Sequence, residues 1–489
     1  MKYIIGNTIE CVLAEPQRTS FLIGIPNRTK GIVASFYVEN FGCRATQADG
    51  VAIERQFEDR GLARAPTPGQ SEIVVLNTCT VTAAADQDAR AAIRRIRREN
   101  PSCQIVVTGC YAQRAPEEVA ALPGVTCVVG NSHKHQLAEI AVASIPHDPI
   151  GSIAAHSGFV PLSSLTREAQ SEIFVSDIFA HTELLAAPVF DARPRNGDRT
   201  RPNLKVQDGC DNRCSFCVIP YVRGRSRSLP LNQIIDEVSS LVSAGYREVV
   251  ISGINLGRWG RDFVKPLRFE DVIQEILRQT SLEKLRISSV EPMDWSDELI
   301  RMMTCSPRIA KHAHVPMQSG SDRVLRAMHR KYRPWHYREK LEKIRAAMPT
   351  AAIGADVMVG FPGESEAEFE ETRRLIEELP FTYLHVFTYS SRPGTRSAAM
   401  RDQVPVQVAR ERNRILRELG AQKKLAFMRA FVGKTVEAIT LNVFDGNSTE
   451  ALTDNYLKLR LSGRHDANRW VKARVEQVET GALVGQVCP

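Results

Sequence analysis

Long apolar runs are missing from this 489-residue sequence. No stretch approaches the ~18 uninterrupted apolar residues that a membrane-spanning helix needs. Within the first thirty residues, Glu10, Glu15 and Arg18 interrupt every apolar run, so the hydrophobic segment of a secretory signal is missing too. These absences argue against a helical membrane protein and predict a cytoplasmic protein with no membrane partner.

A strong charge of one sign is also missing. The formal net charge is +8, and the composition, with 43% hydrophobic and 25% charged residues, is neither that of a disordered chain nor that of a fibrous one. The length is sufficient for two to four domains, each with its own core. The mild positive charge favours a polyanionic partner only weakly, because a basic balance also serves solubility.

In a reducing compartment the eleven cysteines are not expected to form disulfides, so clustered cysteines indicate metal binding. Cys210, Cys214 and Cys217 form a C-x3-C-x2-C run with no fourth cysteine nearby. A closed zinc site takes four protein ligands, whereas a cubane iron–sulfur cluster held by three thiolates leaves one iron open for chemistry. A zinc site with a distant fourth ligand, or three buried apolar cysteines, are the alternatives.

Three further cysteines share a common setting. Cys43, Cys79 and Cys110 each end a short strand-like run and precede a helical stretch. Ligands bind outside the carboxyl ends of the strands in an open parallel sheet, so these thiols can converge on a second three-cysteine cluster. Ordinary burial of cysteine is the alternative. The remaining cysteines belong to no recognisable spacing pattern and are interpreted as structural or incidental: Cys11, Cys103, Cys127, Cys305 and Cys488.

With an aromatic residue, Phe216, before its last cysteine, the C-x3-C-x2-C run resembles the signature of the radical S-adenosylmethionine (SAM) enzymes. The resemblance implies that Cys210, Cys214 and Cys217 hold a catalytic [4Fe-4S] cluster whose free iron chelates SAM. One electron, from a donor such as flavodoxin or ferredoxin, then cleaves the sulfonium to a 5′-deoxyadenosyl radical.

Over residues 31–489 the sequence resembles the methylthiotransferases, radical enzymes with an auxiliary cluster. The matching segments are 40–44, 77–82, 109–112 and 220–224. The resemblance implies a second [4Fe-4S] cluster on Cys43, Cys79 and Cys110 that presents sulfur. It also implies SAM as the source of both radical and methyl group, and a tRNA anticodon loop as the partner.

The order of strand-like and helical runs predicts an α/β fold with three folded domains. Residues 31–143 alternate the two and predict a parallel-sheet domain, and 201–424 repeat βα units, for which the resemblance implies a partial (β/α)6 barrel. Residues 425–489 alternate apolar and polar residues, which predicts a small antiparallel β-barrel similar to the RNA-binding TRAM module of the family. Residues 1–30 are an extension of unknown role, and 144–200 a linker.

Polar and glycine residues after successive barrel strands are candidates for SAM binding, because active sites of such barrels lie at the carboxyl ends of the strands. Glycine there lets the backbone approach a ligand closely. His312 and His314 are instead expected to line the core or the barrel. The cofactor-binding candidates are Phe216, Gly253, Asn255, Ser288, Glu291, Gln318 and Gly360.

Known methylthiotransferases act on a tRNA adenosine carrying a threonylcarbamoyl or an isopentenyl group, or on a ribosomal protein. Segments 287–292 and 389–395 resemble the threonylcarbamoyladenosine branch, which predicts conversion of that nucleoside at position 37 to its 2-methylthio derivative. The isopentenyl branch is the alternative. A non-catalytic iron–sulfur protein that binds RNA is the alternative from a different class.

Overall fold

The computed structural model describes residues 34–144, 171–181 and 200–488. The predicted extension, 1–30, lies outside the described residues, as does most of the predicted linker, 144–200. The described residues fall in one compact unit, Ala34–Pro489. None of the helices in these ranges is both long enough and apolar enough to cross a membrane.

The amino-terminal domain is built on a parallel sheet in the order β2-β1-β3-β4-β5-β6. Its central strands are buried along their whole length, as expected for a sheet covered on both faces. The last strand comes from the segment predicted as a linker, so part of that segment completes the sheet. The strands are β1 (Ser35–Asn40), β2 (Ala63–Arg64), β3 (Ile73–Thr78), β4 (Gln104–Gly109), β5 (Val125–Gly130) and β6 (Glu172–Phe174).

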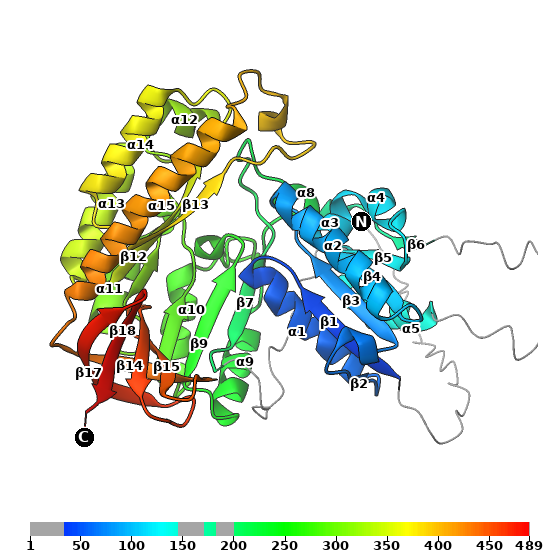
Figure 1. Cartoon of the computed structure of the whole chain (residues 1–489), viewed down its shortest axis with the longest axis horizontal. Helices are drawn as coiled ribbons and strands as arrows, with labels where there is room; N and C mark the ends of the chain where they lie inside the picture. The colour runs from blue at the N-terminus through cyan, green and yellow to red at the C-terminus, as the bar shows by residue number, and fades with distance from the viewer. Residues whose placement is uncertain (1–33, 145–170, 182–199, 489) are drawn as a thin grey trace, which may run out of the picture. The chain divides into compact units, whose positions relative to one another are not determined.

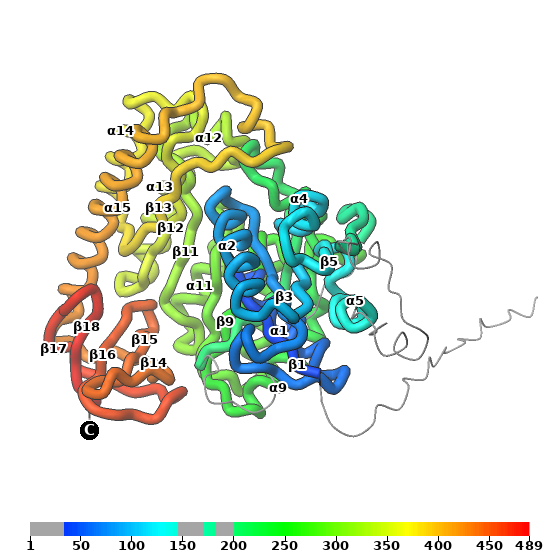
Figure 2. Tube along the Cα trace, turned by 45° about the vertical axis from the view of Figure 1, so that its right-hand side comes forward, coloured from blue at the N-terminus to red at the C-terminus, as the bar shows by residue number. Residues whose placement is uncertain are grey.

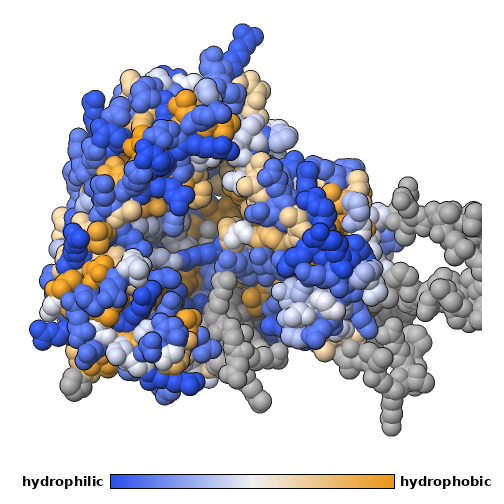
Figure 3. Space-filling model, viewed as in Figure 1, coloured by the Kyte–Doolittle hydropathy of each residue, from blue (hydrophilic) through white to orange (hydrophobic). Residues whose placement is uncertain are grey.

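Helices cover both faces of this sheet (Figure 1) and form two apolar cores. The covering helices are α1 (Arg44–Glu58) and α5 (Leu137–Ala143) on one face, and α2 (Ala83–Glu99), α3 (Cys110–Arg114) and α4 (Pro116–Ala120) on the other. The hydroxyl of Thr82 caps α2 by accepting from the Ala85 N–H at 3.2 Å. Figure 3 shows a hydrophilic surface over α2, where Arg94 and Arg98 are exposed.

The central domain carries six parallel strands in chain order, β7, β9, β10, β11, β12 and β13, with β8 added antiparallel to β7. Two isolated bridges, Leu285 to Ile309 and Ser289 to His314, connect β10 to the β11 side. The result is a partial (β/α)6 barrel. Its strands are β7 (Asn203–Asp208), β8 (Arg227–Ser228), β9 (Glu248–Gly253), β10 (Lys284–Ile287), β11 (His312–His314), β12 (Ala352–Val359) and β13 (Tyr383–Thr388).

The helices of the central domain pack outside these strands around one large apolar core. Both views show α13, α14 and α15 along β12 and β13 (Figures 1 and 2). Helix α15 spans residue 424, the predicted domain boundary. The helices are α8 (Ile219–Arg223), α9 (Leu231–Ser243), α10 (Phe269–Gln279), α11 (Asp297–Cys305), α12 (Asp322–Ala327), α13 (Pro334–Ala347), α14 (Glu366–Glu378) and α15 (Val406–Arg429).

The carboxyl-terminal domain is a closed barrel in the order β14-β15-β16-β18-β17. Its pairs are antiparallel as predicted, except for the parallel pair of β16 with β18. Met428 and Phe431, at the end of α15, contribute to its core. The strands are β14 (Thr435–Phe444), β15 (Ser448–Thr453), β16 (Lys458–Ser462), β17 (Trp470–Glu479) and β18 (Ala482–Val487). The α/β architecture with a small terminal β-barrel is confirmed.

Candidate active site

The C-x3-C-x2-C run lies in the loop between β7 and α8, where all three cysteines are half-buried. Burial raises the pKa of Cys210 to about 11 and that of Cys217 to about 12, and the nearby Cys214 thiol acts in the same direction. Three thiols that influence one another in one short loop are suited to a shared metal cluster, whose charge would hold them deprotonated.

Polar donors surround this cysteine loop. Arg330 donates from Nη1 to the Cys214 sulfur at 3.1 Å, and Asn255 donates from Nδ2 to the Cys210 sulfur at 3.6 Å. Arg330 is also paired with Glu291, which fixes its guanidinium beside the loop. Such donors orient thiolate ligands and stabilise their negative charge.

The other three cysteines stand at one edge of the amino-terminal sheet. Cys43 directly precedes α1, Cys79 directly follows β3, and Cys110 begins α3 directly after β4. The parallel register aligns Asn40 with Asn77, and Thr78 with Gly109, which brings the three cysteines to the same edge. Burial raises the pKa of Cys79 to about 12, with the Cys110 and Cys43 thiols adding to the effect.

Gly42 allows the first strand end to approach the second. Its φ is +97°, in the region that favours glycine. A Cβ at this position would lie 2.5 Å from the Cβ and 2.9 Å from the sulfur of Cys79. A side chain at residue 42 would therefore displace Cys79.

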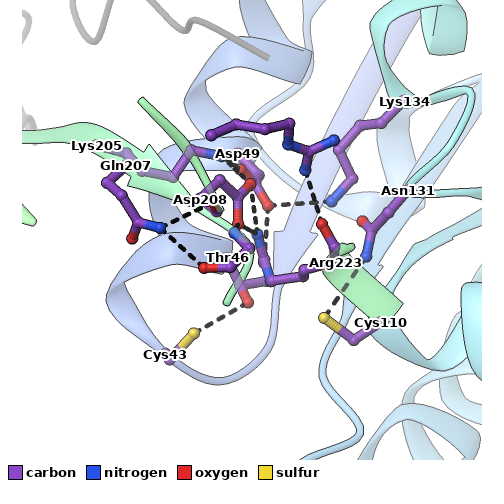
Figure 4. A network of polar contacts seen from close by, with 12 residues as sticks. Cys43, Thr46, Asp49, Cys110, Asn131, Lys134, Lys205, Gln207, Asp208 and Arg223 are labelled. Atoms are coloured by element: carbon purple, nitrogen blue, oxygen red, sulfur yellow. Dashed lines mark hydrogen bonds and ion pairs between the residues drawn. The ribbon is translucent and has the colours of Figure 1, made fainter. Parts of the chain in front are cut away.

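A buried charge network lies next to this second set and was not predicted from the sequence (Figure 4). The carboxylate of Asp49 on α1 pairs with Lys134 at 3.1 Å, with Arg223 at 2.9 Å and with Lys205. Asp208, at the end of β7, pairs with Lys205 at 2.9 Å and with Arg223 at 3.0 Å. All five side chains are buried. The network joins the two cysteine-bearing domains, and its three cations exceed its two carboxylates.

The pKa shifts of Asp49 and Arg223 favour their ionised forms, whereas burial lowers the pKa of Lys134. Burial alone would raise the pKa of Asp49, but Lys134, Lys205 and Arg223 outweigh it and hold that pKa well below its usual range. Burial would likewise lower the pKa of Arg223, but Asp208, the Cys110 thiol and Asp49 raise it. Arg223 thus responds both to the carboxylates and to a candidate cluster cysteine.

A cavity of about 740 Å³ lies at the carboxyl ends of the barrel strands. Five of the candidate SAM-binding residues line it, namely Gly253, Asn255, Ser288, Glu291 and Gln318, and Cys43 lines it as well. The other two candidates are not among its lining residues. Phe216 packs in an apolar cluster with Phe361 and Met328. Gly360 donates its N–H to Glu364 at 2.7 Å, and a Cβ there would meet that of Ala409 at 2.6 Å.

Unpartnered polar atoms on this cavity fit a polar cofactor. The Ser252 Oγ and the Asn255 Oδ1 are buried and have no hydrogen-bond partner within the described residues. A buried polar atom without a partner is costly, so both atoms suit a ligand that donates hydrogen bonds, such as an amino group. No three His, Cys, Asp or Glu side chains of the described ranges converge on a single metal ion. A cubane cluster spreads its thiolates over separate irons, so this finding does not bear on it.

The far wall of the cavity combines residues of all three domains. Arg44 of α1 donates to the Tyr456 hydroxyl at 3.0 Å, and the Tyr456 ring lies 4.5 Å from that of His312. His312 in turn contacts the Tyr383 hydroxyl at 2.7 Å. His312 and His314 line the cavity, as expected for barrel-lining histidines. Tyr456, which comes from the carboxyl-terminal domain, faces this cavity.

Comparison with known proteins first defines the class. The Radical SAM superfamily model matches residues 204–376, and the model of an uncharacterised protein family, UPF0004, matches 35–130. Among solved structures, the radical S-adenosylmethionine methyltransferase TsrM from Kitasatospora setae has a similar fold, with a TM-score of 0.53 and 16% identity. That similarity covers 75% of this chain and 77% of TsrM. The superfamily implies SAM and one [4Fe-4S] cluster as cofactors.

Closer relatives then define the family. A threonylcarbamoyladenosine tRNA methylthiotransferase, MtaB of Bacillus subtilis, is 37% identical over 89% of this chain and 92% of its own length. The MtaB of Aquifex aeolicus is 33% identical over 89% and 99%. A tRNA-2-methylthio-N(6)-dimethylallyladenosine synthase of Novosphingobium aromaticivorans is 33% identical over 83% and 86%. The chain belongs to the radical SAM methylthiotransferases, which confirms the predicted enzyme class.

Proposed function

We propose that this chain replaces the hydrogen on carbon 2 of N6-threonylcarbamoyladenosine, at position 37 of tRNA, with a methylthio group. The observation that carries the proposal is the similarity to relatives named for this substrate, five of which are 32–37% identical over 81–93% of the chain. Relatives named for dimethylallyladenosine reach 33%, so the isopentenyl nucleoside is the second candidate substrate.

The proposal assigns a [4Fe-4S] cluster to each cysteine set. Cys210, Cys214 and Cys217 would hold the cluster that binds SAM, and bound SAM supplies hydrogen-atom abstraction when an external electron donor reduces this cluster. Cys43, Cys79 and Cys110 would hold the auxiliary cluster. Cys43 lines the cavity that also holds Ser252 and Asn255, which supports one shared reaction chamber.

Residues of this chain would orient the reactants in that chamber. The Nδ2 of Asn255 donates to the Cys210 sulfur, whereas its Oδ1 accepts no hydrogen bond from the described residues. The Asn255 amide therefore suits a position between the cluster and the cofactor. The backbone N–H of Asn255 donates to Gln207 at 2.7 Å, which fixes the turn after β9. Holding reactants in a closed cavity excludes water and limits side reactions of reactive intermediates.

The carboxyl-terminal barrel would bind the tRNA. A single-stranded anticodon loop can present an unstacked base to such a cavity, and exposed lysine and arginine residues of the barrel can contact phosphates. The family models that match end at residue 376, so the TRAM-like role of this barrel is part of the proposal.

Expression of the chain in cells that lack the native enzyme tests the reaction. Mass spectrometry of tRNA nucleosides should detect the 2-methylthio derivative of threonylcarbamoyladenosine. The Cys210→Ala/Cys214→Ala/Cys217→Ala variant serves as the matched inactive control. Appearance of the isopentenyl derivative instead would favour the second candidate, and appearance of neither would contradict the proposal.

A further inference from the structure

One cation on the cavity wall lacks a counter-ion. Arg44 is half-buried and lines the 740 Å³ cavity, and no carboxylate of the described residues lies within ion-pair distance of it. Within the described part of the chain, the Arg44 side chain donates a hydrogen bond to the Tyr456 hydroxyl. The other buried arginines near the cavity are paired, Arg330 with Glu291 and Arg286 with Glu248. A partly desolvated charge without a partner is unfavourable, so the site suits an anionic ligand.

The surroundings of Arg44 favour an anion over a cation. The guanidinium of Arg44 lies 6.0 Å from the centre of the Tyr456 ring, and that of Arg286 lies 5.4 Å from it on the same wall. Of the two carboxylates that line the cavity, Glu291 is paired with Arg330, and Asp356 lies 3.5 Å from the Nε2 of His314, beyond hydrogen-bond contact. Among the described residues that line this cavity, Arg44 presents a positive charge without an ion-pair partner.

We propose that Arg44, oriented by Tyr456, binds the carboxylate of the threonylcarbamoyl group. This inference rests on the proposed function, since the substrate supplies the anion. The threonyl moiety ends in a carboxylate, whereas an isopentenyl group carries no charge. An arginine can bind a carboxylate through two parallel hydrogen bonds, which gives geometric as well as electrostatic selectivity. Arg44 is then a specificity residue that separates the two candidate substrates.

The inference gives the carboxyl-terminal barrel a role inside the cavity. Tyr456 follows β15, and its hydroxyl accepts the hydrogen bond that orients Arg44. Tyr456 has a φ of +67°, an uncommon conformation for a residue with a side chain, and this turn directs its ring to His312 and Tyr383. Recognition of the modified base would thus combine the first and last domains of the chain.

A phosphate of the RNA offers the same anionic oxygens as the carboxylate, so the test must separate the two. Binding of the full-length chain is measured to three anticodon stem-loops of one sequence. Their target adenosine carries threonylcarbamoyl, the methyl ester of that group, or no modification. The ester removes the charge and keeps the shape, so the affinity ratio of acid to ester reports the carboxylate contact alone.

Wild type should bind the acid at least about tenfold more tightly than the ester. Arg44→Gln should bring this ratio close to one, and Arg44→Lys should leave an intermediate value, because lysine keeps the charge and loses the planar fork. Tyr456→Phe should lower the ratio less than Arg44→Gln. Arg417→Gln, on the exposed face of α15, is the matched control and should keep the wild-type ratio.

Either of two results with Arg44→Gln would overturn the assignment. Equal weakening of all three RNAs, which leaves the ratio of acid to ester at the wild-type value, would show that Arg44 contacts a phosphate. Unchanged affinity for all three RNAs would show that it contacts neither anion. Each ratio compares two RNAs on one protein preparation, so a loss of folded protein does not alter it. If wild type methylthiolates the acid RNA without preferring it to the ester, this inference fails and the proposed function stands. Absence of any methylthio product from that RNA would instead contradict the proposed function.

Discussion

The two sets of cysteines each bring three thiols together, but different features of the chain place them. Cys210, Cys214 and Cys217 lie in one loop, so their proximity depends on local chain geometry. Cys43, Cys79 and Cys110 come from three strand ends, and their proximity depends on the register of a parallel sheet. The first set can be recognised by its spacing alone. The second can be recognised only once the strands are placed side by side.

Their electrostatic settings differ as well. In the loop set (Cys210, Cys214 and Cys217), the sulfur of Cys214 accepts a hydrogen bond from Arg330, whose charge is balanced by Glu291. The sheet set (Cys43, Cys79 and Cys110) is adjacent to the buried charge network, in which three cations face two carboxylates. A surplus positive charge in a buried setting would stabilise an anionic cluster, and the ion pairs of Asp49 with Lys205 and Arg223 connect the two domains.

The largest expected effect comes from removing the loop set. Replacing Cys210, Cys214 and Cys217 by alanine should abolish SAM cleavage, because no open iron would remain to bind the cofactor. The iron content of the reconstituted protein should fall from about eight to about four atoms per chain. The measurements are release of 5′-deoxyadenosine and iron quantification. Cys305→Ala, an exposed cysteine outside both sets, should change neither, and persistent cleavage in the triple variant would contradict the assignment.

Removing the sheet set should separate SAM cleavage from methylthiolation. Alanine at Cys43, Cys79 and Cys110 should again halve the iron content but leave 5′-deoxyadenosine release in place, because the loop set is intact. Methylthiolation of tRNA should stop. Nucleoside mass spectrometry after reaction with purified tRNA checks this, and a methylthio product from the triple variant would show that the auxiliary role is wrong.

Asp49→Asn tests the charge network. It leaves three buried cations with one carboxylate, which should lower the free energy of unfolding by about 3–5 kcal/mol. In wild type the pKa of Asp49 is lowered, so its stabilisation is fully present above the ordinary aspartate value of about 4, begins to decline below it and is lost as the pH falls through the lowered pKa of the folded state. Denaturant unfolding of both proteins from pH 7 to pH 3 measures the difference, which should begin to narrow below about pH 4.

The control for this change is Asp59→Asn, whose carboxylate is exposed and 4.0 Å from Arg55. Solvent screens such a pair, so the substitution should alter stability little. If Asp59→Asn lowered the free energy of unfolding as much as Asp49→Asn, burial of the charge network would not explain the effect at Asp49.

The smallest effect is expected on the RNA side, far from both cysteine sets. Lys458→Ala and Arg469→Ala, at exposed positions of the β-barrel, should each reduce the salt dependence of tRNA binding by about 0.7 in the log–log slope. Lys265→Ala, exposed in a loop of the central domain, is the control. Identical slopes for all four proteins would exclude these residues from phosphate contacts. A chain ending near residue 424 is less informative, because it cuts α15 and also removes Tyr456 from the cavity.

Much of the architecture follows from local patterns. The parallel-sheet domain, the repeated βα units of the central domain and the helical stretch after Cys79 were all predicted, because clear periodicity marks each of them. Five of the seven candidate SAM-binding residues line the cavity. Gly360 does not line the cavity. The absence of a side chain at this position instead permits a close contact with the Cβ of Ala409.

The charge network and the far wall could not be predicted in the same way. Asp49, Lys134 and Arg223 lie far apart in the chain, and each taken alone resembles an ordinary surface charge. Asp49 meets Lys134 only when the segment before α5 packs on α1, and it meets Arg223 only when α8 of the central domain approaches α1. Tyr456 likewise belongs to a strand pattern of the β-barrel, and nothing local indicates that its ring reaches a cavity in another domain.

The attachment of the β-barrel has a consequence for how RNA would be received. Arg286, fully buried and paired with Glu248, donates to the carbonyls of Asp454 at 3.0 Å and Thr453 at 3.3 Å. The turn that carries Tyr456 is thereby anchored to the central domain before any substrate arrives. The protein side of the chamber is preorganised, so the conformational adjustment falls on the RNA, whose target base must leave its stack at a cost of a few kcal/mol. Loops that unstack easily would then be modified faster than rigid ones of equal sequence.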